Sequence, residues 1–149
     1  MENETYNILR ADKCIFEFQS TGIRSLLKQV EFREIEYSYG AYNMSLGTVL
    51  EDGSVNFSDS TNNGDVVKVL STAIYCAKIF ANEFPERVIF FRGNTEQKNR
   101  VYNEILRRYY DDFSMNFNIF GMNIKEGRTF VQKFNKRKDY SGFYLSVKI

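Results

Sequence analysis

The sequence predicts an α+β fold in a single domain: a mixed, mostly antiparallel sheet of about 7–8 strands with two principal helices. Short segments of alternating apolar and polar residues fill both ends of the chain, and two longer segments with helical apolar spacing lie between them. The chain has 149 residues, of which 43% are hydrophobic, so one domain with a substantial core is expected. A single Pro argues against disorder.

The first third of the chain reads as a meander of strands. Strands are expected at residues 14–19, 26–37, 42–50 and 55–57. The apolar phase of the second strand changes at Arg33 and Glu34, which predicts a β-bulge. The pair Asp52-Gly53 predicts a hairpin turn. Residues 1–13 carry no regular pattern and are expected to be loosely ordered.

Two helices alternate with strands in the remainder. The helices are expected at residues 65–84, ended by Pro85, and 96–112, and the strands at residues 88–91, 115–122, 128–134 and 142–149. The predicted order is therefore ββββαβαβββ. Because strand–helix–strand connections favour right-handed crossovers, the middle of the sheet is expected to be parallel. Both helices should then begin at the same edge of the sheet.

Composition excludes several kinds of chemistry. The chain has no His, so there is no Ser-His or Cys-His nucleophile pair and no HExxH zinc site. Cys14 and Cys76 lie far apart without metal-binding spacing, which favours two reduced thiols in a cytoplasmic protein. No metal and no cofactor is predicted. No apolar run is long enough for a membrane helix, and the N-terminus lacks the pattern of a signal peptide.

Charge is unevenly distributed along the chain. Residues 1–85 contain 7 Lys/Arg and 12 Asp/Glu, whereas residues 86–149 contain 13 Lys/Arg and 7 Asp/Glu. A basic half can attract phosphate, nucleic acid or an acidic protein partner. Alternatively, both halves share one sheet and their fields largely cancel.

The segment from Arg87 to Tyr102 has the pattern of a strand, a tight turn and a helix start. Such a corner directs backbone N–H groups and the positive end of a helix dipole at a ligand above it, which suits an anion. The predicted anion-binding residues are Arg92, Gly93, Asn94, Thr95 and Arg100. The alternative is an ordinary helix start capped by Asn94 or Thr95, with Tyr102 in the core.

The loop at residues 59–65 is a second strand-to-helix connection. Ligands of open α/β sheets bind at such an edge. Asp59 and Asp65 are possible metal ligands, but capping of the following helix is the favoured interpretation.

A basic run near the C-terminus is the third candidate site. Basic residues beside aromatic ones can hold phosphates and stack on bases. The predicted nucleic-acid-binding residues are Lys133, Lys136, Arg137, Lys138 and Tyr140. A solvated hairpin loop is the alternative.

Several short motifs resemble an uncharacterised family of small bacterial single-domain proteins. They are Asn62-Asn-Gly-Asp65, Phe90-Phe-Arg-Gly-Asn-Thr95, Arg100-Val-Tyr102, Asp112-Phe113 and Phe120-Gly121. Members of that family often read F-x-G-S-T at the corner, where this chain has Asn94 in place of Ser. The resemblance covers most of the chain from about residue 14 and implies no activity.

The order of elements also resembles, more weakly, the acyl-CoA N-acyltransferase fold. That resemblance implies cofactor contact by Asn94 and acid catalysis by Tyr102, with a V-shaped opening between adjacent parallel strands at residues 88–91 and 115–120. The glycine-rich cradle of that family is missing, since residues 62–65 contain one Gly.

From the sequence we expect an intracellular bacterial binding module that contacts a phosphate-bearing ligand, RNA or DNA in preference to a free nucleotide, through its basic C-terminal half. One alternative is an acyl-CoA acyltransferase-like enzyme using Tyr102. Another is an interaction protein, such as half of a toxin–antitoxin or defence pair. The sequence leaves the oligomeric state open.

Overall fold

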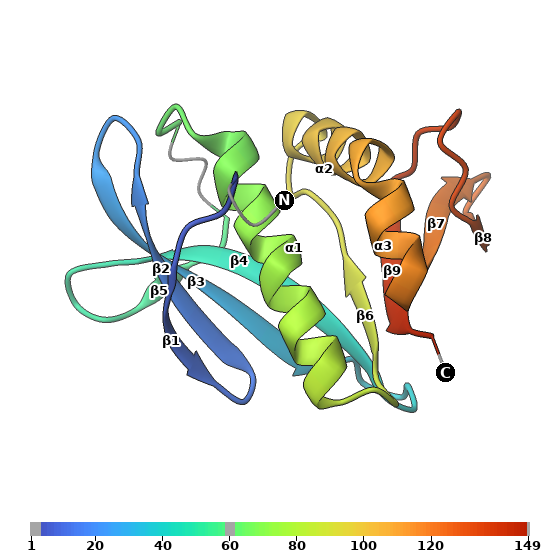
Figure 1. Ribbon diagram of the computed structural model, residues 1–149, viewed down its shortest axis with the longest axis horizontal. Helices are drawn as coiled ribbons and strands as arrows, with labels where there is room; N and C mark the ends of the chain where they lie inside the picture. Colours follow the sequence, from blue (N-terminus) through green and yellow to red (C-terminus); the bar gives the residue numbers. More distant parts are fainter. Residues whose placement is uncertain (1–3, 59–61, 149) are drawn as a thin grey trace.

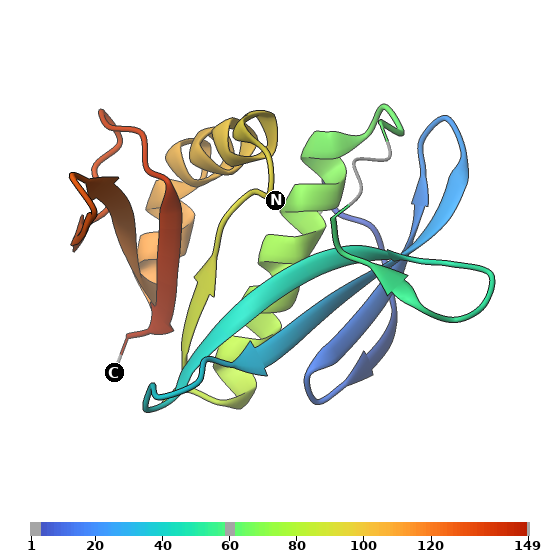
Figure 2. The same cartoon turned by 180° about the vertical axis from the view of Figure 1, so that it is seen from behind.

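A twisted open sheet with helices packed on one of its faces makes up the fold (Figures 1 and 2). The computed structural model describes residues 4–58 and 62–148. Its strands are β1 (Ile8–Asp12), β2 (Ile15–Thr21), β3 (Ser25–Glu34), β4 (Ala41–Val49), β5 (Val55–Asn56), β6 (Val88–Phe91), β7 (Phe117–Lys125), β8 (Arg128–Lys133) and β9 (Gly142–Val147). Its helices are α1 (Val66–Glu83), α2 (Glu96–Arg108) and α3 (Tyr110–Asn116). The predicted α+β fold with a mostly antiparallel sheet is confirmed.

The sheet has one parallel pair among the described strands. The strand order is β1-β2-β3-β4-β6-β9-β7-β8, with β5 beside β4. Strands β4 and β6 run parallel, and the other pairs run antiparallel. This follows from the connections, because α1 crosses over between β4 and β6 whereas hairpins join most of the other neighbours. The opening predicted between residues 88–91 and 115–120 is therefore wrong, since β9 lies between β6 and β7 and pairs with both.

The N-terminal segment is better ordered over residues 4–13 than the sequence suggested. Strand β1 pairs with β2, and the backbone N–H of Tyr6 donates to Oγ1 of Thr72 at 2.9 Å. The Tyr6 ring stacks on Phe18 with centroids 5.8 Å apart. Residues 1–3 lie outside the described part of the chain.

Two predictions about the secondary structure, a β-bulge and the extent of one helix, are corrected by the structure. Strand β3 keeps continuous register with β4 up to Glu34, so the predicted bulge is wrong; the phase change comes instead from the following turn, where Tyr37 has φ 64°. The predicted helix at residues 96–112 breaks at Tyr109 into α2 and α3. Acidic Asp111 and Asp112 suit the first turn of the new helix.

The core lies between the sheet and the helices. Phe32 of β3 stacks on Phe80 of α1, with centroids 4.3 Å apart. On the other side of the parallel pair, the Phe91 ring contacts Tyr102 of α2 and Phe143 of β9. Aromatic packing thus couples α1 and α2 to the strands beneath them.

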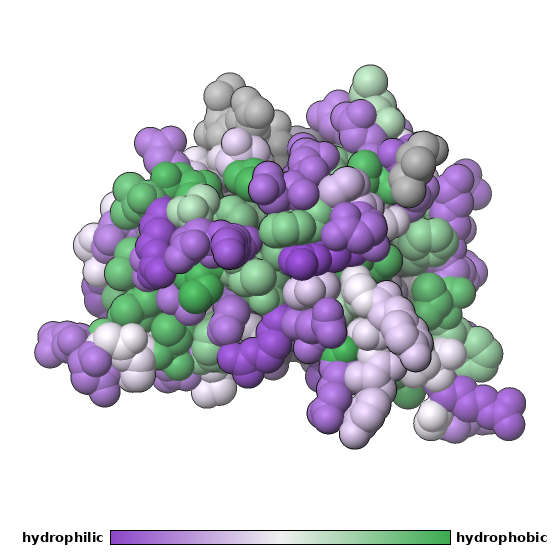
Figure 3. Space-filling model, turned by 90° about the horizontal axis from the view of Figure 1, so that it is seen from below, coloured by the Kyte–Doolittle hydropathy of each residue, from purple (hydrophilic) through white to green (hydrophobic). Residues whose placement is uncertain are grey.

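Within the described residues, no helix is long and apolar enough to cross a membrane. On the face seen in Figure 3, hydrophobic and hydrophilic residues are interspersed.

Candidate ligand cleft between β4 and β6

The parallel pair separates soon after it forms. Strand β4 pairs with β6 only through Ala41–Asn43 and Val88–Phe90. Strand β4 then continues to Val49, while the chain after Phe91 turns away to start α2. Figure 2 shows the two strands diverging from a common lower end. Because α1 and α2 both start at the wide end, their first residues line the opening, as the sequence predicted for the two helix starts.

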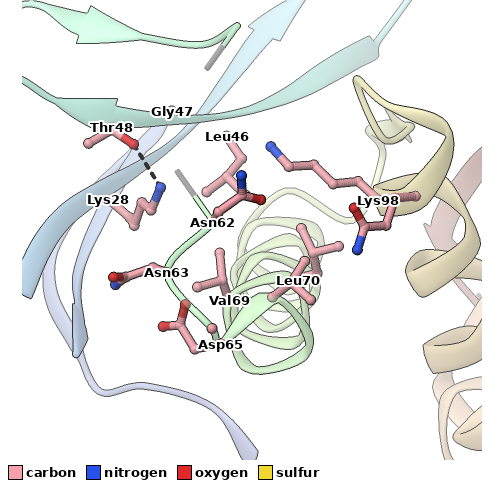
Figure 4. A pocket seen from close by; sticks show the side chains of 13 residues that line it. Lys28, Leu46, Gly47, Thr48, Asn62, Asn63, Asp65, Val69, Leu70 and Lys98 are labelled. Atoms are coloured by element: carbon pink, nitrogen blue, oxygen red, sulfur yellow. Dashed lines mark hydrogen bonds between the residues drawn. The ribbon is translucent and has the colours of Figure 1, made fainter. Parts of the chain in front are cut away.

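The first pocket at this opening has a volume of about 260 Å³ and lies between β4 and the start of α1 (Figure 4). Its walls come from β3, β4, the loop before α1 and the first turns of α1 and α2. Polar lining residues are Lys28, Thr48, Asn62, Asn63, Asp65, Gln97 and Lys98. Leu46, Val69 and Leu70 form its apolar floor.

Lys28 is a buried cation on the sheet side of this pocket. Only 5% of it is exposed, and its Nζ donates to Oγ1 of Thr48 at 2.7 Å. Burying an ammonium group is costly unless it interacts with polar partners, and the Thr48 hydroxyl is one such partner. Lys98 reaches the pocket from the opposite side, extending from α2 toward β4 (Figure 4).

The start of α1 is not capped by its own N-cap side chain. The Asp65 carboxylate instead accepts hydrogen bonds from the Tyr6 hydroxyl at 2.6 Å and the Ser20 hydroxyl at 2.5 Å. No acidic residue lies in the first turn. The positive end of this 18-residue helix lies at the pocket, and the Asp65 carboxylate beside it is bonded by these two hydroxyl groups.

Asn63 fixes the loop before α1. Its side chain accepts from the Arg24 backbone N–H at 2.7 Å and donates to the Arg24 carbonyl at 2.8 Å and to the Ser20 hydroxyl at 3.0 Å. Asp65 was predicted to favour helix capping, and it occupies the N-cap position without the cap hydrogen bond. Asp59 lies outside the described residues. Elsewhere in residues 4–58 and 62–148, no three His, Cys, Asp or Glu residues are grouped as metal ligands.

The start of α2, in contrast, is capped by a side chain. Thr95 is the N-cap, and its Oγ1 accepts from the Lys98 backbone N–H at 3.1 Å. The Asn99 side chain accepts from the Gly93 N–H at 3.0 Å. A Cβ at Gly93 would lie 2.3 Å from the Asn99 nitrogen, so this close turn requires glycine. The corner predicted to bind an anion is thus partly closed by internal hydrogen bonds.

A second pocket of about 280 Å³ continues the cleft toward the narrow end. Arg92, Gly93 and Asn94 line it, together with residues of β4 that include Asn43 and Ser45. The two pockets share Leu46, Leu70 and Lys98 as lining residues, so they form one two-part cleft. The remaining predicted anion-binding residues, Thr95 and Arg100, line neither part.

Tyr102 lines the second pocket from below but belongs to the core. Only 3% of it is exposed, and its ring packs against Phe91 at 5.1 Å and Phe143 at 6.4 Å between centroids. Burial raises the pKa of its hydroxyl well above the usual range. Such a group holds its proton tightly, which does not suit the acid–base role implied by the acyltransferase resemblance.

Part of the basic run near the C-terminus is bonded to side chains of α2 and α3. The Arg107 side chain donates to the Lys136 carbonyl at 2.7 Å and bonds the Asp139 carboxylate at 2.7 Å. Lys136 pairs with Asp111 at 3.1 Å. Lys133, Arg137 and Lys138 are exposed.

Tyr140, predicted to stack on bases, is buried. Only 3% of the residue is exposed, its hydroxyl accepts from the Asn135 backbone N–H at 3.0 Å, and its ring covers Gly121, where a Cβ would lie 2.2 Å from the ring. The ring therefore offers no free face for a base in this structure.

The two lysines that line the cleft, Lys28 and Lys98, were not predicted from the sequence. The signal for Lys28 is its strand phase, because it shares the inward parity of Val30 and Phe32 in an otherwise apolar row. Lys98 had no such signal, since many exposed helix positions carry Lys.

Comparison with known proteins assigns the chain to a family. The model of a family of unknown function (DUF6934) matches residues 2–148. The chain belongs to this family. The resemblance to an uncharacterised domain family, inferred from the corner motifs, is thereby confirmed. No curated protein and no solved structure matches the chain.

Proposed function

We propose that the chain binds a small phosphate-bearing molecule in the two-part cleft between β4 and β6. The observation that carries this proposal is the divergence of two parallel strands at the edge where two helices begin. Ligands of open sheets bind at such an edge, where strand ends and helix starts leave room and polar groups. The cleft's volumes of about 260 and 280 Å³ suit a small molecule.

The charges of the cleft favour an anion. Lys28 and Lys98 lie in the first part, and Arg92 and Lys98 in the second. Asp65 is the one acid among the described lining residues, and two hydroxyl donors already bond its carboxylate. The uncapped start of α1 adds a positive dipole end at the same place.

Calorimetric titration with inorganic pyrophosphate and with ADP tests the proposal. We expect saturable binding, and a loss of roughly tenfold or more in affinity for Lys98→Ala, because a charge-assisted hydrogen bond contributes about 1.5–3 kcal/mol. Arg92→Ala should weaken binding in the same direction.

Arg100→Ala is the matched control. Arg100 is an exposed cation on the same helix as Lys98 but lines neither part of the cleft. Its removal should leave the affinity unchanged. Absence of heat with both ligands, or equal losses for the Lys98 and Arg100 variants, would rule out the cleft as the binding site.

Coenzyme A is a second candidate ligand, favoured specifically by the separation of β4 from β6. An extended arm can pass between two strands that pair over three residues and then diverge. In this case coenzyme A should bind at least tenfold tighter than ADP, because the arm adds contacts beyond the phosphates. Equal affinities for coenzyme A and ADP would favour a nucleotide-type ligand and would rule out the acyl-CoA alternative. The burial of Tyr102 gives no support to its predicted catalytic role.

RNA or DNA remains the larger phosphate-bearing alternative. Lys133, Arg137 and Lys138 are exposed and supply cations for it. Fluorescence anisotropy with short labelled strands separates the two cases, since contact with several phosphates gives affinity that falls steeply with salt. Binding that is lost in the triple alanine variant of these three residues and retained in Lys98→Ala would favour nucleic acid over a small ligand.

A further inference from the structure

The Asp65 carboxylate uses only one of its two oxygens within the described part of the protein. The hydroxyls of Tyr6 and Ser20 both donate to Oδ2, and no donor of residues 4–58 or 62–148 bonds Oδ1. Asp65 lines the first part of the cleft, where Figure 4 shows it beside Asn63 at the start of α1. An ionised carboxylate can only accept hydrogen bonds, so a ligand group that binds Oδ1 must donate one.

Thr48 has the opposite hydrogen-bonding character in the same part of the cleft. Its Oγ1 accepts from Nζ of Lys28 at 2.7 Å, and the residue is only 7% exposed. A hydroxyl that accepts one hydrogen bond still has its own hydrogen to donate, and no side chain or carbonyl of the described residues accepts it. Because buried polar groups are nearly always bonded, this hydrogen calls for an acceptor inside the pocket.

A neutral hydroxyl group satisfies both of these requirements. It can donate to Asp65 Oδ1, and a hydroxyl oxygen can accept from Thr48. A phosphate group presents acceptor oxygens and negative charge, so it suits Thr48 but is repelled by Asp65. An apolar group would cover both polar side chains without bonding either. The polar lining of the first part therefore selects hydroxyl groups.

The remaining walls separate an apolar floor from the cations. Leu46, Val69 and Leu70 lie beneath the first part of the cleft and offer carbon atoms to the C–H groups of a sugar ring. Lys98 lines both parts of the cleft, and Arg92 lines the second. Charged groups for a phosphate thus lie next to the part that selects hydroxyls.

We infer that the ligand of the cleft is a phosphorylated sugar, either free or as the ribose phosphate of a nucleotide. The inference rests on the proposed function and names the class of its ligand. The sugar hydroxyls occupy the first part, where Asp65 accepts from one and Thr48 donates to one. The phosphate lies against Lys98 and Arg92, where the cleft has no carboxylate among the described lining residues other than Asp65.

Calorimetric titration of the unmodified chain with matched phosphate esters tests the inference. Ribose 5-phosphate should bind about tenfold tighter than ethyl phosphate, which is also a monoester but has no hydroxyl group, because hydrogen bonds to charged acceptors are the stronger ones. Adenosine 5′-monophosphate distinguishes the two sources of the sugar phosphate. Tighter binding than that of ribose 5-phosphate would assign a nucleotide, and equal binding would assign the sugar phosphate alone.

Asp65→Asn tests the carboxylate itself. Its side-chain oxygen can still accept from Tyr6 and Ser20, but an amide NH₂ replaces the second acceptor. The affinity for ribose 5-phosphate should fall about tenfold. The affinity for pyrophosphate should instead rise, by about twofold or more, because one negative charge leaves the cleft. An equal loss for both ligands would overturn the inference.

Asp52→Asn is the matched control, because Asp52 is an exposed acid in the turn between β4 and β5 and lines neither part of the cleft. This variant should bind every ligand as the unmodified chain does. Saturable binding of pyrophosphate, with ribose 5-phosphate no tighter than ethyl phosphate, would overturn this inference and leave the proposed function standing. Absence of heat with all of these ligands would overturn both.

Discussion

Two adjacent buried polar side chains of α1, Thr72 and Ser71, differ in their hydrogen bonding. Thr72 is fully buried, donates to the Lys68 carbonyl at 2.7 Å and accepts from the Tyr6 N–H at 2.9 Å. Its neighbour Ser71 is equally buried, yet its Oγ has no hydrogen-bond partner, alone among buried side-chain polar atoms in residues 4–58 and 62–148. An unsatisfied buried hydroxyl costs about 1–3 kcal/mol.

These adjacent residues therefore make a matched pair for mutation. Ser71→Ala should raise the free energy of unfolding by about 1 kcal/mol, because it removes an unsatisfied group from a good helix position. Thr72→Val should lower it by about 1–2 kcal/mol, because the Tyr6 N–H loses its acceptor. Urea denaturation measures both values. A destabilised Ser71→Ala protein would show that the hydroxyl has a partner in solution.

The segment between β8 and β9 is held by α2 through one buried amide. The Asn103 side chain accepts from the Tyr140 N–H at 2.9 Å and donates to the Tyr140 carbonyl at 3.0 Å. Asn99, one turn earlier, donates to the same carbonyl at 2.6 Å. The loop is thus anchored by helix positions some forty residues earlier in the chain.

Removal of this anchor should loosen the loop and leave the sheet intact. In Asn103→Ala the buried Tyr140 N–H has no acceptor, so unfolding should become easier by about 1–3 kcal/mol. Hydrogen exchange should accelerate across residues 135–141 more than in α1. Asn135→Ala, an exposed loop change that removes only a local bond to Arg137, should cost under about 1 kcal/mol. Equal exchange in the two variants would contradict the anchoring role.

Local features of the fold were predictable from the sequence, whereas long-range pairings were not. Strand β6 lies at the predicted residues 88–91 because a short apolar run bounded by turn residues has few alternatives. The Asp52-Gly53 turn holds for the same local reason, with Gly53 at φ 88°. The insertion of β9 between β6 and β7 depends on packing across the chain, which periodicity does not encode.

The candidate site, too, was predictable from the sequence only where it depends on local structure. The helix-start corner supplied Arg92, Gly93 and Asn94 as predicted lining residues, because a strand–turn–helix pattern is local. The cleft itself depends on where β4 leaves β6, and the burial of Tyr140 depends on space above Gly121. Both depend on tertiary packing, which the local pattern of residue types does not reveal. For this reason Tyr140 was predicted from the sequence to be available to a ligand.

The whole molecule should lose stability at alkaline pH through its buried core acids. Burial raises the pKa of the Cys76 thiol from 9.0 to about 12. Above pH 9 the unfolded chain therefore loses this proton while the folded chain retains it, so stability is complete below pH 9 and declines as pH rises toward 12. The slope should be about 1.4 kcal/mol per pH unit from Cys76, and the raised pKa of Tyr102 should add to it at higher pH.

Urea denaturation at pH 8, 9, 10 and 10.5 measures this decline. The Cys76→Ala variant separates the thiol from other titrations: it should be less stable at pH 8, because a core side chain is truncated, but should lose stability more slowly above pH 9. The free energies of the two proteins should therefore converge as pH rises. Parallel decline of both proteins would mean that the Cys76 thiol titrates alike in the folded and unfolded chains, and that water reaches the packed space between α1 and Tyr102.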